Sequence, residues 1–166
     1  MKYEIMLPGH PKPGDYRLDN ISPYKIHQRC AEKFHVGRFL LVADAAHLCN
    51  PFGGLGLTGG IVDAGGCSDC LIGLAYGVAD ESILDKYDEI RRGMWNNIIN
   101  VVSTLNIRRL NDQDPDMALE NDEFLKGLAL AEKDPSLMKN TVNVRMDIQH
   151  DFTQYYTKPL TAQTMT

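Results

Sequence analysis

The fold of this chain is decided by residues 37–60, which read GRFLLVADAAHLCNPFGGLGLTGG. Within this stretch, the continuous apolar run of residues 39–42 predicts a short strand that is covered on both faces. That strand delivers Asp44 at its C-terminal edge, and ligands of α/β proteins bind outside the carboxyl ends of strands. The glycine-rich residues 51–60 then predict a turn that leads into a helix.

This order of features suits a polar ligand. A carboxylate at a strand end can accept hydrogen bonds from sugar or polyol hydroxyls. The start of the next helix offers unpaired N–H groups and a partial positive charge, which favour an anion or an electron-rich carbonyl. A plainer interpretation is that Asp44 caps the following turn and that the glycines only join a strand to a helix. The long ordered combination of both elements favours the ligand site.

Other parts of the chain show a second set of elements, and most of them are helical. Glycines inside the helix that follows residue 60 each cost about 1 kcal/mol relative to alanine, so we expect another helix or a flat ligand to approach its backbone closely. The pattern predicts strands at 3–7 and 24–30, a loop at 8–20, a turn at 36–38, a helix ending near Gly77, a long helix over 82–110, a break at 111–115, a helix over 116–133 and a fourth helix from Pro135.

Composition excludes several classes of function. The chain has 166 residues, a net charge of −5 and a pI near 5.5, so no basic field favours nucleic acid or an acidic membrane surface. No apolar run approaches the roughly 18 residues of a membrane helix, and no signal-peptide pattern opens the chain. Four cysteines are too few for a disulfide scaffold, which indicates a reducing compartment, most simply the cytoplasm.

Cys67 and Cys70 form a CxxC motif. A redox role requires an exposed position at a helix start after a strand, whereas this pair falls inside a helical pattern, so we expect small packing residues. No second CxxC and no paired histidines accompany them, and we expect no metal site.

Residues 37–47 resemble the second FAD-binding motif of class A flavin monooxygenases, the p-hydroxybenzoate and phenol hydroxylase group, and residues 51–60 resemble the flavin-contacting turn that follows it. The variant GLGLTGGIVDA looks closest to fungal members. The resemblance implies an α+β fold: the mainly helical C-terminal portion of the FAD-binding fold, with a few short strands and without the Rossmann half. Residues 1–23 would be a loop and strand remnant of the substrate side, 24–110 a partial FAD-binding region, and 111–166 C-terminal helices and a tail.

The resemblance also implies roles for single residues. Asp44 would bind the ribitol hydroxyls of FAD, and Pro51 would lie near the reactive edge of the isoalloxazine as the catalytic candidate. Gly53 and Gly54 would let the backbone approach the ring. Ala43 departs from the family, which usually has glycine before the aspartate.

The helix start completes the implied cofactor site. Gly56, Leu57 and Thr58 would present N–H groups and the positive helix end to the N1/C2 carbonyl region of the ring, which stabilises reduced, anionic flavin. Gln28 and Arg29 match the stretch before the motif and would support it.

A second glycine pattern has another explanation. Residues 54–59 fit GxGxxG, but the dinucleotide version directly follows a strand and precedes a second strand that ends in an acid. Residues 49–51 intervene here, and residues 75–80 end a helix. We therefore expect ring-side contacts without a pyrophosphate cradle, and weak or no FAD binding by the chain alone.

Three hypotheses of function remain open. The first is a monooxygenase fragment that shares an FAD site, with NAD(P)H as reductant, a phenolic or polyketide-like substrate and an N-terminal complementing chain. The second is a cofactor-free tailoring enzyme. The third is a helical interaction partner, since an exposed apolar stripe on the long helix favours a homo-oligomer or heteromer. Acid–base candidates for the second hypothesis are His27, His47, Asp63 and Tyr87.

Overall fold

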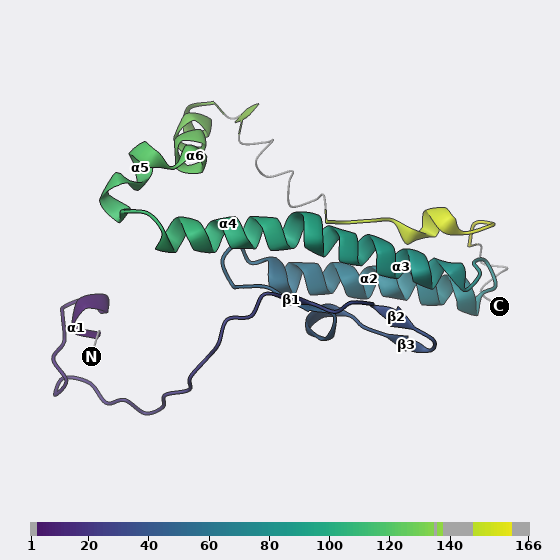
Figure 1. Cartoon of the computed structure of the whole chain (residues 1–166), viewed down its shortest axis with the longest axis horizontal. Coiled ribbons are helices and arrows are strands. Elements are labelled where there is room, and N and C mark those ends of the chain that lie inside the picture. Colours follow the sequence, from purple (N-terminus) through teal and green to yellow (C-terminus); the bar gives the residue numbers. More distant parts are fainter. Residues whose placement is uncertain (1–2, 135, 138–147, 161–166) are drawn as a thin grey trace.

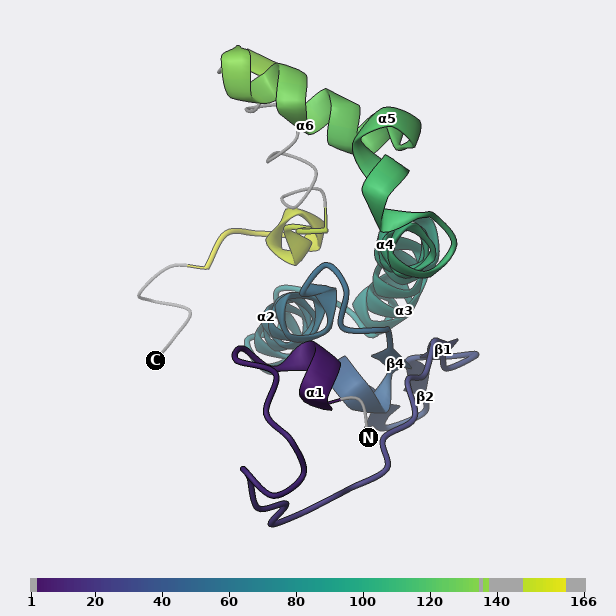
Figure 2. The ribbon, with the colours of Figure 1, turned by 90° about the vertical axis from the view of Figure 1, so that its left-hand side faces the viewer.

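Two long helices packed side by side form the body of the molecule (Figure 1). The computed structural model describes residues 3–134, 136–137 and 148–160. Helix α2 spans Leu55–Ala75, and its neighbour is a continuous helix built from α3, Ser82–Met94, a π-helical turn η2, Trp95–Ile99, and α4, Asn100–Asn111. Viewed from the end, the two helices lie next to each other with the strands along one side (Figure 2). The expected long helix over 82–110 is thus confirmed.

Short elements surround this pair. The strands form two antiparallel pairs, β1 with β4 and β2 with β3. The remaining bounds are α1 Tyr3–Met6, β1 Arg29–Cys30, β2 His35–Val36, β3 Phe39–Leu40, η1 Ala43–Ala45, β4 His47–Leu48, η3 Pro115–Met117, α5 Ala118–Asn121, α6 Glu123–Lys133 and η4 Phe152–Tyr155.

Glycine sets both the end and the packing of α2. Gly77 adopts φ 61°, and the bonds Gly77 N–H to Leu74 O and Val78 N–H to Gly73 O form a Schellman motif that ends the helix, as expected. Within the helix, a Cβ added at Gly66 would lie 2.6 Å from the Phe152 ring. The close approach expected at the helical glycines is therefore made by protein side chains on this face.

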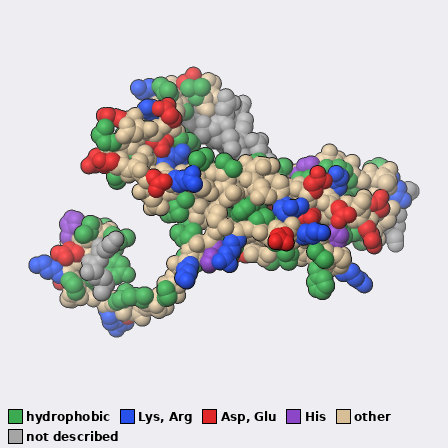
Figure 3. All heavy atoms as spheres, viewed as in Figure 1, with side chains coloured by type: hydrophobic (Ala, Val, Ile, Leu, Met, Phe, Trp, Pro, Cys, Tyr) green, Lys and Arg blue, Asp and Glu red, His purple; other side chains and the backbone are tan. Residues whose placement is uncertain are grey.

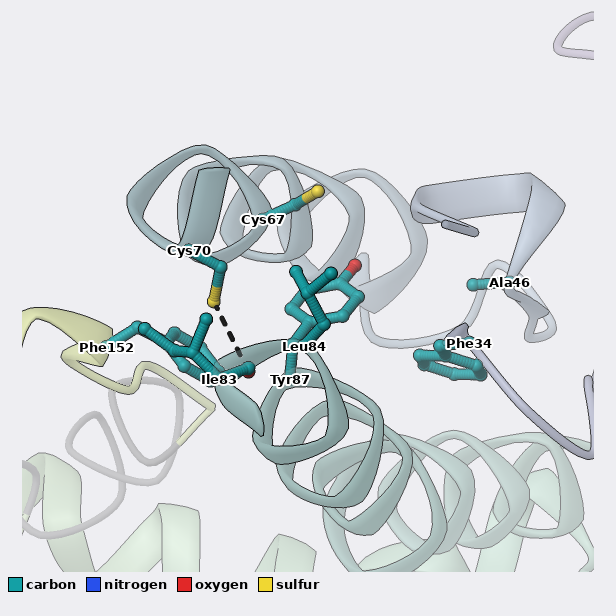
Figure 4. Packing of buried hydrophobic residues seen from close by; sticks show 8 residues of the cluster. All are labelled: Phe34, Ala46, Cys67, Cys70, Ile83, Leu84, Tyr87 and Phe152. Carbon is teal, nitrogen blue, oxygen red and sulfur yellow. Dashed lines mark hydrogen bonds between the residues drawn. The ribbon is translucent and has the colours of Figure 1, made fainter. Parts of the chain in front are cut away.

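The core lies between α2, α3 and the segment around η4, with one side closed by the strands (Figure 4). Cys67 and Cys70 point into it from α2, and the Cys70 thiol lies 3.8 Å from the carbonyl oxygen of Ile83. Burial, with the nearby Cys67 and Asp69, raises the pKa of Cys70 to about 12. These thiols are protonated packing groups in the middle of a helix, a position that contradicts a redox role.

The strands are much shorter than expected. Of residues 24–30, just Arg29 and Cys30 are in a strand, and of residues 39–42 just Phe39 and Leu40. The expectation of a strand buried on both faces is wrong: β3 is one arm of a hairpin that turns at Gly37, and Phe39 is 80% exposed. An apolar run indicates a preference for burial, but the described residues provide no layer that covers residues 39–42 on both faces.

Two further predictions are wrong in detail. Residues 3–6 form a single helical turn instead of a strand, closed by Leu7 N–H to Tyr3 O at 2.9 Å and followed by Pro8, which cannot continue a helix. The helix expected over 116–133 is divided into η3, α5 and α6, because Asp122 is an N-cap that accepts from the N–H groups of Phe124 and Leu125. The fourth helix expected from Pro135 lies largely outside the described residues.

The N-terminal arm, residues 3–26, extends away from the body, and much of its apolar surface is uncovered (Figures 1 and 3). Its exposed apolar side chains include Ile5, Met6, Ile21 and Tyr24. In the described ranges, no helix has the length and apolarity required to cross a membrane.

Candidate functional site

Asp44 lies at the surface in the 3-10 turn η1, directly after the hairpin. The turn is closed by Ala46 N–H to Ala43 O at 2.8 Å. Ala43 has φ 56°, the left-handed conformation that glycine adopts freely and that a Cβ disfavours. A glycine at this position, as in the resembling family, would meet the same geometry without strain. The Asp44 carboxylate is exposed, so it can accept hydrogen bonds from a ligand.

The start of α2 has no side-chain cap, which leaves its backbone N–H groups able to bind an anion. Its N-cap, Gly54, has φ 66°, and no side chain accepts from the first-turn N–H groups. Gly53 has φ 117°, so both glycines hold conformations that other residues rarely adopt. Thr58 directs its hydroxyl back to Gly54 O at 3.0 Å. The backbone N–H groups of the first turn thus remain for solvent or a ligand.

Packing brings η1 and the start of α2 together. A Cβ added at Gly60 would lie 2.8 Å from the Ala43 Cβ, so the two backbones nearly touch. Cys49 also lies close to the start of α2, since a Cβ added at Gly56 would lie 3.9 Å from its sulfur. Burial and the nearby Asp44 carboxylate raise the pKa of the Cys49 thiol. Asp44 and the first turns of α2 therefore border one region of the surface.

A polar network fixes the loop that carries Pro51. Gln28 accepts from the Asn50 N–H at 2.9 Å and donates to Ser103 Oγ at 2.7 Å and to Asn100 Oδ1 at 2.9 Å. Asn50 in turn donates to Ser103 O at 2.9 Å. The supporting role expected of Gln28 has a structural basis here, whereas Arg29 is exposed.

Sequence reasoning missed Asn50 and Ser103 in this network. No local signal pointed to Ser103, because it lies between Val101 and Leu105 and outside the apolar stripe predicted for the helix over 82–110.

Behind the loop lies a buried ionic cluster. The Asp63 carboxylate of α2 accepts hydrogen bonds from His47 Nε2 at 2.6 Å and from Arg91 Nε at 2.6 Å. All three side chains are nearly inaccessible to solvent. Tyr87 donates to Leu41 O at 3.0 Å. Of the acid–base candidates, His47, Asp63 and Tyr87 are thus engaged in the core, and His27 is half-buried. Arg91 lies among apolar positions of the helix over 82–110, and a charge at such a position is a signal of a buried pair.

Residues expected to form the cofactor site now have defined positions. Asp44, Gly56, Leu57 and Thr58 border one region, and the loop holding Pro51, Gly53 and Gly54 connects β4 to α2. GxGxxG lies at a helix start separated from β4 by residues 49–53, and a helix, α3, follows α2, so the Rossmann pattern is absent from this stretch. Among the described residues, no three His, Cys, Asp or Glu side chains gather as metal ligands.

Comparisons with known proteins place this fold in a flavoprotein family. The model of the FAD binding domain family matches residues 8–101. The chain belongs to this family, and in sequence and fold it corresponds to part of a class A FAD-dependent aromatic monooxygenase. The expected mainly helical α+β fragment with few strands is confirmed.

Two relatives show this similarity in detail. The chain is 38% identical over 125 residues to para-nitrophenol 4-monooxygenase of Pseudomonas sp. strain WBC-3, covering 75% of this chain and 31% of that protein. It is 30% identical over 161 residues to 3-(3-hydroxy-phenyl)propionate/3-hydroxycinnamic acid hydroxylase of Mycolicibacterium smegmatis, covering 95% of this chain and 28% of that protein.

Among solved structures, p-nitrophenol 4-monooxygenase of Pseudomonas putida DLL-E4 superposes with a TM-score of 0.71 at 34% identity, covering 89% of this chain and 37% of that one. The chain therefore spans about a third of the length of these relatives. All three relatives are bacterial, so the expected likeness to fungal members is not confirmed.

Proposed function

We propose that this chain supplies the isoalloxazine and ribitol side of an FAD site in an aromatic monooxygenase. The observation that carries the proposal is the pairing of an exposed carboxylate, Asp44, with the uncapped start of α2 across one surface. An acceptor for hydroxyls and donors for a carbonyl or anion lie next to each other there. Family membership makes flavin the ligand that unites these two requirements.

Each group has a defined task in this proposal. Asp44 accepts hydrogen bonds from the ribitol hydroxyls. The N–H groups of Gly56, Leu57 and Thr58, with the positive end of α2, stabilise negative charge on the N1/C2 side of the ring. The αL conformation of Gly54, with open space where a Cβ would stand, lets a flat ring approach the backbone. Pro51 lies in the loop that borders the ring edge.

When bound, FAD supplies the oxidoreductive chemistry of the family. NAD(P)H is the proposed reductant. We propose a phenolic substrate, because the relatives are named for a nitrophenol and for hydroxyphenyl acids. These names favour small phenols over the polyketide-like substrates also considered. Hydroxylation requires the parts of the site that the described residues lack, above all a pyrophosphate cradle.

Flavin binding by an Asp44 variant tests the site. Riboflavin is titrated into the chain, and quenching of flavin fluorescence gives Kd. We expect Asp44→Ala to weaken binding about tenfold, the value of one charge-assisted hydrogen bond. Asp112→Ala removes the same charge at the exposed C-terminus of α4 and is expected to leave Kd unchanged. Equal Kd values for Asp44→Ala and the unmodified chain would overturn the proposal.

We also propose a partner that covers the exposed face of α2 and completes the site. Leu57, Ile61 and Leu71 are 78%, 63% and 47% exposed, and a groove of about 530 Å³ runs past Leu71 between Ala64 and Tyr76. Apolar patches of this kind mark interaction surfaces. The relatives are about three times longer than the matched part, so their remaining portion is the occupant that we propose for this face.

Complementation tests the occupant directly. The portion of the Pseudomonas sp. para-nitrophenol 4-monooxygenase outside the match is mixed with this chain, and complex formation is followed by light scattering. Leu71→Asp should abolish the heteromer. Leu105→Asp, at a 51% exposed position on α4, should leave it intact. A homo-oligomer that Leu71→Asp dissociates, with no heteromer from the unmodified chain, would contradict this occupant.

A further inference from the structure

A buried carboxylate lies directly beneath the turn that presents Asp44. Asp63 is fully buried in the third turn of α2, and both of its oxygens are engaged. Oδ1 accepts from Arg91 Nε at 2.6 Å, and Oδ2 accepts from His47 at 2.6 Å. The same Oδ2 lies 3.3 Å from the backbone nitrogen of Ala43, which donates to it. One side chain thus ties α2, α3, β4 and η1 together.

The charge of Asp63 is retained in this setting. Burial alone would raise the pKa of its carboxyl, but the hydrogen bond from His47 and the Arg91 guanidinium outweigh burial and hold the pKa below its usual value. The carboxylate therefore remains a strong acceptor for the Ala43 N–H at neutral pH.

Ala43 requires such an acceptor. Its φ of 56° is unfavourable for a residue with a Cβ, and unusual backbone conformations persist where the surroundings over-determine them. The Asp63 bond acts on the N–H side of this residue, and the backbone of Gly60 lies against its Cβ on the other side. Ala43 directly precedes Asp44, so its conformation sets the direction in which the Asp44 carboxylate leaves the turn.

We propose that Asp63 is a positioning residue that holds Ala43 in the left-handed conformation and thereby aims Asp44 at the ligand. The part that concerns flavin rests on the proposed function, whereas the part that concerns the turn stands on the geometry alone. Asp63 touches no ligand in this account and acts through the backbone of η1.

The principal variant removes the acceptor and keeps the packing. Asp63→Leu with Arg91→Met replaces the ion pair by apolar side chains of similar volume, an exchange that proteins often tolerate. Arg91→Met alone is the matched control, since Asp63 still accepts from Ala43 there. Folding of both variants is checked by circular dichroism, and Asp63→Ala with Arg91→Met replaces the double variant if that one does not fold.

Two readouts separate the turn from the ligand. Amide hydrogen exchange and carbon chemical shifts at Ala43 report the turn without any flavin. In the acceptor-free variant we expect exchange at Ala43 to accelerate at least tenfold, its shifts to leave the left-handed range, and riboflavin Kd to rise at least fivefold. The control should match the unmodified chain in the Ala43 shifts and in riboflavin Kd.

A third substitution distinguishes positioning from general stability. Ala43→Gly in the acceptor-free background should restore riboflavin Kd, because glycine adopts the required φ without help, while the melting temperature stays at the value of that background. Unchanged Ala43 shifts and exchange in a folded acceptor-free variant would overturn the inference. If the shifts change and the unmodified chain binds no riboflavin, the flavin proposal fails and the role of Asp63 in the turn stands.

Discussion

The two faces of helix α2 have similar composition and opposite surroundings. One face is buried along its whole length, and its residues recur at intervals of three and four: Gly59, Asp63, Gly66, Cys70 and Gly73. The other face is also apolar but exposed, with Leu57, Ile61 and Leu71 open to solvent. A helix that is apolar all round is normally buried all round. The contrast supports the proposal that a partner covers the exposed face.

The buried face should be far more sensitive to substitution than the exposed one. The largest effect is expected for Asp63→Ala, because it leaves the Arg91 charge buried without its partner, at a cost of about 3–5 kcal/mol. Urea unfolding measures this loss. Ile61→Ala, at a 63% exposed position on the other face, should cost about 0.5 kcal/mol or less. Equal losses at both positions would remove the distinction between the faces.

Acid should also remove the stabilising contribution of the Asp63 carboxylate, and it does so without a substitution. The native pKa of Asp63 is held below the ordinary value of 3.8, so its contribution to stability is complete above that pH and is lost as the pH falls through the native pKa. Below pH 4, the melting temperature of the unmodified chain should fall more steeply than that of Asp63→Leu with Arg91→Met. Parallel melting curves over this range would show that Asp63 does not titrate below its usual range.

Neighbouring glycines offer the finest comparison of the two faces. Gly66→Ala places a Cβ 2.6 Å from the buried Phe152 ring, and overpacking of this kind costs about 1–3 kcal/mol. At the adjacent Gly65 nothing lies within 4 Å of the new Cβ, so Gly65→Ala should stabilise the helix by up to about 1 kcal/mol. Thermal unfolding of the two variants measures both shifts. Shifts of the same sign would show that Phe152 does not pack against Gly66 as closely as described.

Sequence predicted the helices well because their signals are local. The stripe over 82–110 and the glycine stop at Gly77 each depend on residues within a few positions of one another. The strands were overestimated, since the apolar run at 39–42 indicates burial without saying what covers it. The fold class was implied by the resemblance of residues 37–60 to a known family and did not depend on strand length.

The candidate site likewise has a part that the sequence predicts and a part that it does not. Asp44 and the glycine turn were recognisable from their order in the chain. The links from Asp63 to Ala43 and from Gln28 to Ser103 were not, because they join residues 20 and 75 positions apart. Side-chain pairing across such separations follows from tertiary packing, which periodicity does not encode. A charged residue in an apolar stripe, as at Arg91, is the local trace that such pairs leave.

The ratio of riboflavin to FAD affinity tests the central claim most directly. A half-site that contacts the ring and ribitol gains nothing from the adenosine diphosphate portion of FAD. We therefore predict weak binding, with Kd values for riboflavin, FMN and FAD that agree within about threefold. A tenfold ratio between two of these values would represent about 1.4 kcal/mol of additional contact. Isothermal titration of the chain with each flavin gives the three values. FAD binding more than tenfold tighter than riboflavin binding would contradict the account.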